Sequence, residues 1–177
     1  MNDINQKLST PASKLAKSLA EKGFRIFTRK EAVLEALEIG YSESYASQII
    51  FHLRNAGWLE VIRPGLYSLN SIFLGGHPIH EFEVASHVAK NSVISHFSAM
   101  QHYGFTDQIP HITYATVLTG TTLPRQKKGQ PLLIQGNEYH FTQIREDQFF
   151  GHKKIWVGET RIIITDPERT LLDGLIK

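Results

Sequence analysis

Apolar residues in the first 55 positions recur at helical spacing in three successive segments. The first segment places Leu15, Ala16 and Leu19 on one face and ends at a glycine. In the second, Thr28 and Glu31 have the spacing of a capping box, and Ser42 is a capping residue before the third. The apolar stripe of the second segment consists of Ala32, Val33, Ala36 and Leu37. We therefore predict helices over residues 11–22, 29–40 and 43–55, with a very short strand over 24–28.

Two short apolar runs follow the third helix and flank a Pro64-Gly65 turn. The pattern of Leu59 and Val61 before the turn and Leu66 and Tyr67 after it is typical of a β-hairpin. The resulting order is helix, short strand, helix, helix and hairpin. This is the order of a winged helix-turn-helix, which we predict over residues 1–70.

The rest of the chain alternates short helical and strand patterns. Residues 71–80 are the expected junction, because two adjacent glycines and Pro78 interrupt regular structure. Beyond the junction we predict helices over 81–90 and 97–103, strands over 93–95, 112–118, 132–134, 138–144, 153–157 and 161–165, and a last helix from Asp166. The fold class is therefore α+β: a winged helix followed by a small mixed domain over 81–177 with a mainly antiparallel sheet.

Composition narrows the class of protein. The chain has 177 residues, no cysteine, and no apolar run of the length that a membrane span needs. Its N-terminus has no apolar signal core, so we expect a cytoplasmic protein. Residues 1–70 carry nine Lys or Arg against seven Asp or Glu, whereas the two kinds balance in residues 71–177. The positive excess of the N-terminal part suggests an anionic partner.

The third predicted helix has the surface of a DNA reader. Its core face consists of Ala46, Ile49, Ile50 and Leu53, and its opposite face of Ser44, Gln48, Phe51 and Asn55, flanked by Tyr45, Ser47 and His52. Gln48 could pair with adenine, and Ser44 or Tyr45 with a base edge or a phosphate. Phe51 would contact a thymine methyl group, or pack on the wing or on the second domain.

Positive charge is scarce in this helix, where Arg54 is the only basic residue. Phosphate binding must then come from other segments. The candidates are Arg29 and Lys30 at the start of the second helix, Lys14 and Lys17 on the first, and Arg63 at the wing. The N-terminus of the second helix would add its amide groups and dipole. The predicted DNA-binding residues are Arg29, Lys30, Ser44, Tyr45, Gln48, His52 and Arg63; the alternative is a winged helix used only for protein contact.

Metal and catalytic patterns are weak. His80, Glu83 and His87 share one helical face, but a zinc site needs further ligands and support behind them. Asp166 and Glu168 could be a carboxylate pair, yet Asp-Pro-Glu at a helix start is what capping alone produces. We predict no enzyme activity, no metal and no cofactor.

Three stretches together resemble the AbiEi-type antitoxins of bacterial type IV toxin–antitoxin (abortive infection) systems. They are LRNAGWLEVIRPGLYSL, VISHFSAMQHYGFTDQIP and ITDPERTLLDGL. The wing pattern falls on Gly57, Arg63, Gly65 and Tyr67. The third stretch is the most specific, and its signature falls on Asp166, Pro167, Glu168, Arg169, Thr170, Leu171 and Asp173.

The resemblance implies more than the residue pattern does. Such antitoxins bind inverted repeats in their own promoter through an N-terminal winged helix and repress the operon. Their C-terminal domain counteracts a nucleotidyltransferase-like toxin, which is thought to happen without a stable complex. The implied partners are therefore double-stranded operator DNA and a cognate toxin, with no membrane.

The resemblance has one departure. Family members usually continue well past the Asp-Pro-Glu signature, so we expect either a fragment of a longer protein, with a truncated second domain, or a short member. The last helix would then expose an apolar face of Leu171, Leu172, Leu175 and Ile176 and be less well ordered or rely on a neighbour. The alternatives are a plain repressor whose second domain binds a ligand or dimerises, and, less favoured, a DNA-targeted nuclease or nucleotidyltransferase.

Overall fold

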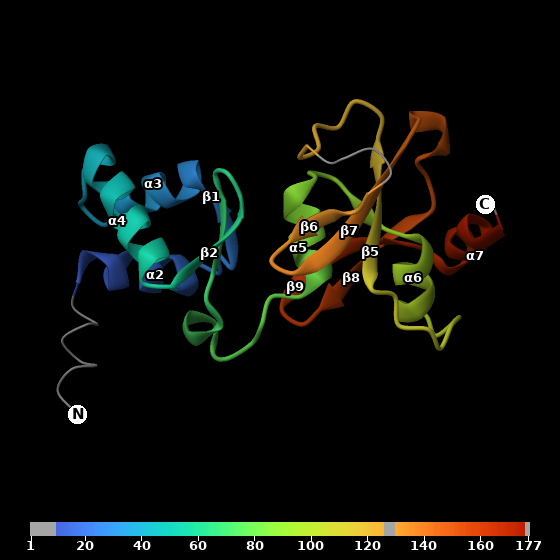
Figure 1. The fold of residues 1–177 in the computed structure, drawn as a ribbon, viewed down its shortest axis with the longest axis horizontal. Coiled ribbons are helices and arrows are strands. Elements are labelled where there is room, and N and C mark those ends of the chain that lie inside the picture. The colour runs from blue at the N-terminus through green and yellow to red at the C-terminus, as the bar shows by residue number, and fades with distance from the viewer. Residues whose placement is uncertain (1–9, 126–129, 176–177) are drawn as a thin grey trace. The chain divides into compact units, whose positions relative to one another are not determined.

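A computed structural model describes residues 10–125 and 130–175. The chain divides into two compact units, with the boundary between Ile79 and His80 (Figure 1). Each unit has its own sheet and its own helices. None of the described helices is both long and apolar enough to cross a membrane.

The first unit is a winged helix-turn-helix, as predicted. Its elements are α2 (Pro11–Glu21), β1 (Ile26–Thr28), α3 (Arg29–Glu38), α4 (Glu43–Asn55), β2 (Leu59–Arg63) and β3 (Leu66–Leu69). The three strands form an antiparallel sheet in the order β1-β3-β2. The predicted caps are present: Thr28 and Glu31 form a complete capping box, and Ser42 accepts the Tyr45 N–H. These local patterns therefore set the starts of both helices of the helix-turn-helix.

The core of the first unit lies between the three helices and the sheet. Leu15, Leu19, Phe27 and Leu53 are fully buried in it, and the whole predicted core face of α4 is buried. The predicted apolar stripe of α3 needs a correction at Leu37, which is 45% exposed. Its place inside is taken by Glu35, which is 3% exposed and lies between Ala32 and Ala36 on the buried side.

The predicted junction starts with structure of its own. A 3₁₀-helix, η1 (Ser71–Leu74), begins where Asn70 accepts the Ile72 N–H. Phe73 packs edge-on against Trp58, with ring centroids 5.2 Å apart. The first turn of residues 71–80 is therefore packed on the first unit, and the irregular stretch begins at Gly75, which has a positive φ.

The second unit is built on a six-stranded sheet. Its strands are β4 (Val93–Ile94), β5 (Ile112–Leu118), β6 (Leu132–Ile134), β7 (Asn137–Ile144), β8 (His152–Val157) and β9 (Thr160–Thr165), in the order β6-β7-β5-β4-β9-β8. Three of the five pairings are antiparallel, as expected, and the β5–β7 and β4–β9 pairings are parallel. The α+β class is confirmed, and the sheet is mixed.

Helices cover both faces of this sheet. Helix α5 (Glu81–Val88) lies on one face, and α6 (His96–His102) and α7 (Pro167–Leu175) lie on the other (Figure 1). Side chains of successive strand residues alternate between the two faces of a sheet. Thr165 of β9 contacts Thr170 of α7, with 2.7 Å between their hydroxyl oxygens. A short 3₁₀-helix, η2 (Glu146–Gln148), precedes β8. The last helix therefore packs on the sheet through the residues of the Asp-Pro-Glu signature.

Candidate nucleic-acid interface

The outward face of α4 is exposed in the first unit. Ser44, Gln48, Phe51 and Asn55 are all exposed, in agreement with the helical periodicity. Within the described part of the chain, Gln48 makes no hydrogen bond, so both its amide nitrogen and its amide oxygen are available. Such a side chain can form the bidentate contact with adenine that the major groove presents.

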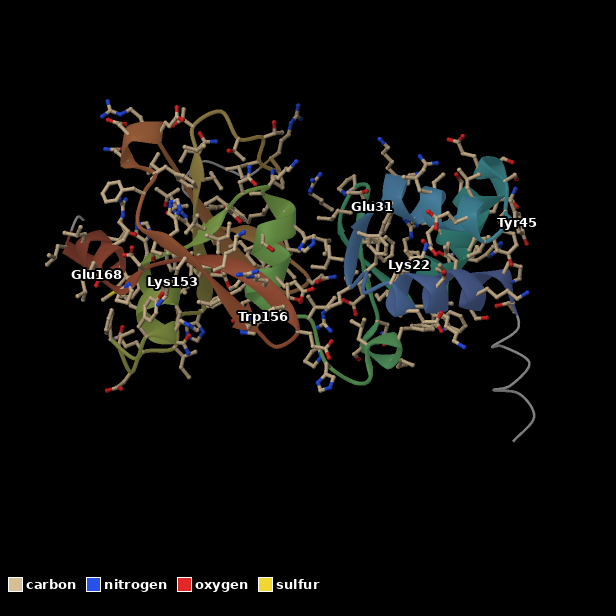
Figure 2. The ribbon with its side chains drawn as sticks, turned by 180° about the vertical axis from the view of Figure 1, so that it is seen from behind. Lys22, Glu31, Tyr45, Lys153, Trp156 and Glu168 are labelled. Carbon is tan, nitrogen blue, oxygen red and sulfur yellow. The ribbon has the colours of Figure 1, made fainter. Side chains whose placement is uncertain are left out.

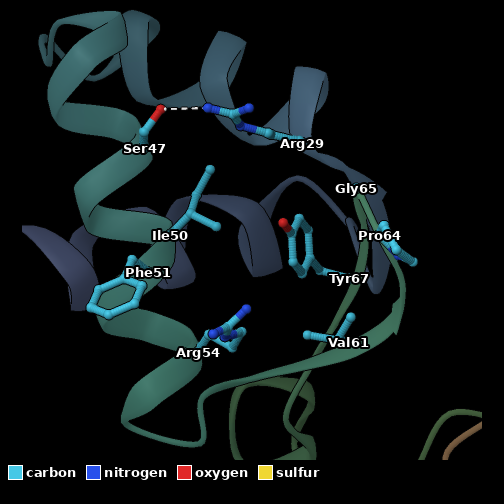
Figure 3. Close-up of a pocket in the computed structure, with 9 residues that line it drawn as sticks. All are labelled: Arg29, Ser47, Ile50, Phe51, Arg54, Val61, Pro64, Gly65 and Tyr67. Atoms are coloured by element: carbon cyan, nitrogen blue, oxygen red, sulfur yellow. Dashed lines mark hydrogen bonds between the residues drawn. The ribbon is translucent and has the colours of Figure 1, made fainter.

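A groove runs between α4 and the wing hairpin (Figure 3). Its volume is about 510 Å³, and its lining comes from α3, α4, β2, β3 and the wing turn. The lining residues are Arg29, Ser47, Ile50, Phe51, Arg54, Val61, Pro64, Gly65 and Tyr67. None of these described residues is acidic, and two of them are arginines. The groove therefore combines an apolar wall with positive charge, which suits a sugar–phosphate backbone or a base edge.

The wing turn is fixed to the start of α3. The Arg29 N–H donates to the Gly65 carbonyl oxygen at 2.9 Å, and the Arg29 guanidinium donates to the Ser47 hydroxyl at 2.8 Å. Gly65 has a φ of +80°, a conformation that L side chains rarely adopt. One arginine thus links the wing, α3 and α4, and it holds the walls of the groove together.

The start of α3 is less open to phosphate than its sequence suggested. The Arg29 N–H is taken by Gly65, and the Glu31 N–H by the Thr28 hydroxyl. The Glu31 carboxylate in turn accepts the Thr28 N–H, which brings a negative charge to this helix end. Amide groups that the capping box and the wing already use are not available to a ligand. The Arg29 and Glu31 amides at this helix end are therefore already used, and phosphate binding there stays a prediction.

The predicted DNA-binding residues fall on different sides of α4 and around it. Ser44 and Gln48 lie on the outward face, and Arg29 lies at the groove. Tyr45 and His52 lie on the flank toward α2, where they line a separate hollow with Thr10 and Pro11. The Tyr45 ring packs edge-on against that of Tyr41, with 5.6 Å between the centroids, and Figure 2 labels Tyr45, which lies in the first turn of α4.

The other predicted cations are exposed. Lys30, at the start of α3, and Arg63, at the end of β2, have no ion pair with a described residue. On α2, Lys14 is exposed, and Lys17 forms an ion pair with Glu21, with 3.7 Å between Nζ and Oε1. The sequence interpretation missed the wing side of the groove, where Val61, Pro64 and Tyr67 line the wall. The sequence pattern predicted the hairpin that carries these residues, but a sequence pattern does not give the distance between the hairpin and α4.

The signature at the end of the second unit forms a polar cluster around α7. The Asp166 carboxylate accepts the Arg169 N–H at 2.8 Å, so it caps the helix as predicted. The Arg169 side chain donates to Asp173 at 2.7 Å, and both side chains are nearly buried. Glu168 is exposed and is not paired with Asp166 in any described contact. Asp166 therefore caps α7, and the ion pair between Arg169 and Asp173 stabilises its first two turns.

The histidine patterns do not converge on a metal site. His80 caps α5 by accepting the Phe82 N–H, and Glu83 is buried. Within the described residues, no group of three or more His, Asp or Glu side chains is placed to hold an ion. His96 has a φ of +50° and lies next to Ser95, with 2.9 Å between its Nδ1 and the hydroxyl oxygen. Burial lowers the pKa of His96, although the nearby Asp173 acts in the opposite direction.

The last helix exposes the apolar face that was expected. Leu171 and Leu172 are about half exposed, and Leu175 is 81% exposed. Ile176, the fourth residue predicted for this face, lies outside the described residues.

A comparison with known families finds a match in the first unit. Residues 14–70 match the model of the family described as "Transcriptional regulator, AbiEi antitoxin". The match covers the winged helix from α2 to the end of β3 and confirms the resemblance there. A comparison with curated proteins found no match.

Proposed function

We propose that this protein is a DNA-binding antitoxin that represses the operon in which it lies. The observation that carries the proposal is the exposed, outward face of α4 beside a basic groove, in a domain that matches an antitoxin regulator family. In a winged helix this face enters the major groove, while the wing contacts the neighbouring backbone. The partner is double-stranded DNA with inverted repeats upstream of its own reading frame.

Within this proposal, residues have different tasks. Gln48 and Ser44 read base edges from the outward face of α4. Arg29, Lys30 and Arg63 contact phosphates from α3 and the wing. Tyr45 and His52, on the α2 flank, would reach only the backbone at the edge of the contact.

The experiment is a mobility shift with the DNA upstream of the reading frame. Arg63→Ala should weaken binding to every sequence and reduce the slope of log affinity against log salt by about one. Gln48→Ala should cost about 1–3 kcal/mol and relax selectivity at one base position only. If neither substitution changes the shift, the DNA-reading assignment is wrong.

The second unit, in this proposal, counteracts a nucleotidyltransferase-like toxin encoded beside the protein. The support is the resemblance of the Asp-Pro-Glu signature, whose residues form the cluster around α7. Co-expression with the product of the next reading frame tests it: growth should be restored by the wild-type chain. Failure to restore growth, with repression intact, would favour the alternative of a plain transcriptional repressor.

A further inference from the structure

Phe51 and Arg54 form a pair at the edge of the groove that the proposed residue tasks leave unused. Phe51 is 53% exposed on the outward face of α4, and the Arg54 guanidinium carbon lies 5.9 Å from the centroid of its ring. Both residues line the groove, and Figure 3 shows the Phe51 ring on the side of α4 away from the wing and Arg54 turned toward Val61. A half-exposed aromatic ring on the face of a DNA-reading helix offers apolar surface for contact with a base.

Arg54 is the groove's free cation among the described residues. The other arginine, Arg29, uses one guanidinium nitrogen on Ser47, which leaves its other donors for the phosphate contact proposed above. Arg54 has no ion pair with a described residue, and no acidic side chain lines the groove. Its planar guanidinium can therefore offer two parallel donors to a ligand, while contact with an aromatic ring restricts its orientation.

The chemistry of the pair matches one dinucleotide step of the major groove. Guanine presents O6 and N7 as adjacent acceptors, the most frequent specific target of arginine. Thymine presents a methyl group, which aromatic side chains contact. When thymine lies immediately 5′ of guanine, the methyl group is next to the guanine acceptors on the same strand. A ring and a guanidinium in contact with each other can then cover both bases at once.

We propose that Phe51 and Arg54 read a thymine–guanine step in the operator. This inference rests on the proposed DNA binding and names the bases that the wing side of α4 recognises. Phe51 covers the thymine methyl group, and Arg54 donates to guanine O6 and N7. Gln48, one turn nearer the start of α4, would read the adjacent base pair.

The test uses the full chain and duplexes selected from a library with a randomised centre. The selected motif should contain a thymine–guanine step. In the best duplex, uracil in place of that thymine removes only the methyl group, and 7-deazaguanine removes only the N7 acceptor. For the wild type, we expect uracil to weaken binding about fourfold, from the burial of one methyl group. The deaza base should weaken it by roughly 5- to 150-fold.

In each variant, the affinity should no longer respond to one of the two base changes. Phe51→Ala should bind the thymine and uracil duplexes equally, and Arg54→Lys, which keeps the charge but not the planar fork, should lose most of its response to 7-deazaguanine. Phe97→Ala and Arg161→Lys, at exposed positions of the second unit, are the matched controls and should respond as the wild type does. Far-UV circular dichroism checks that all variants are folded.

Three results would overturn the inference. The first is a selected motif without the step, and the second is a variant that still senses the base change assigned to it. The third is an Arg54→Lys chain that binds all sequences as the wild type does, which would make Arg54 a phosphate contact. In each case DNA binding itself would stand. A wild-type chain that selects no duplex at all would overturn the proposed function as well.

Discussion

Glu35 is a buried carboxylate in the core of the winged helix. It accepts from Lys22 Nζ at 2.6 Å and from the Ser18 hydroxyl, and Lys22 also reaches Glu38. Figure 2 shows Lys22 between α2 and α3. Burial alone would raise the pKa of Glu35, but the hydrogen bonds from Lys22 and Ser18 outweigh it and hold the pKa below its usual value. The pair joins α2 to α3 and thereby supports the helix on which the wing is fixed.

This arrangement predicts a pH-dependent contribution to stability. Because the folded-state pKa of Glu35 is lowered, its contribution is complete above the unfolded-state pKa near 4.5 and is lost as the pH falls through the folded value. Glu35→Gln should lower the free energy of unfolding by about 1–3 kcal/mol at pH 7. In acid, the free energy of unfolding of this variant should also fall less steeply with decreasing pH than that of the wild type.

Urea unfolding in a Trp156→Phe background, followed by fluorescence, would measure this change. Trp58 then reports on the first unit alone, since the chain's other tryptophan is removed. Glu38→Gln is the matched control, because Glu38 is an exposed partner of the same lysine, and it should change stability little. Equal losses for the two variants would contradict the role given to burial.

At the scale of elements, interactions of its first turn fix where α7 begins. Asp166 accepts the Arg169 N–H, and the side chain of Arg169 then reaches Asp173 one turn later. Gly151 approaches the same place: a Cβ there would lie 2.8 Å from Arg169 Cβ, and its φ is +70°. Gly151 therefore allows the start of β8 to pass close to the helix.

Substitutions at Asp166 separate capping from chemistry. Asp166→Ala should lower the free energy of unfolding of the second unit by about 1 kcal/mol, whereas Asp166→Asn keeps an acceptor and should lose less. Thermal unfolding by circular dichroism measures the difference. Nuclease and nucleotide-transfer assays with added divalent metal should find no turnover in the wild type; turnover abolished in both variants would refute the capping account.

The elements that the sequence predicted well are those set by local rules. The capping box at Thr28 and the caps at Ser42 and Asp166 each involve a residue three positions later, so they can be recognised from the sequence alone. Pairings between distant segments are not visible in this way. The parallel β5–β7 and β4–β9 pairs, and the salt bridge from Lys22 to Glu35, depend on how the elements pack.

The candidate site shows the same division. The outward face of α4 follows from helical periodicity, and its exposed residues were predicted. The groove does not, because it exists only where the wing returns to Arg29 and encloses space beside Phe51 and Arg54. A signal for Glu35 was available, since a carboxylate interrupts the apolar stripe of α3 between two buried alanines.

At the scale of the whole molecule, each unit has its own core and sheet, so damage to one need not reach the other. The two proposed tasks, DNA binding and protection from a toxin, should then be separable by single substitutions in the full chain. Asp173→Ala removes the partner of the nearly buried Arg169 and should destabilise the second unit by about 3–5 kcal/mol. Because no residue of the α4 groove belongs to that unit, the mobility shift should be unchanged.

The reciprocal variant is Arg63→Ala, which changes a wing residue of the first unit and no residue of the signature cluster. It should weaken repression of a reporter placed behind the upstream DNA, while growth under toxin expression remains protected. Asp173→Ala should give the opposite result: repression kept and protection lost. Parallel loss of both activities in either variant would show that the units act together on one partner, and it would exclude an antitoxin whose winged helix serves only the promoter.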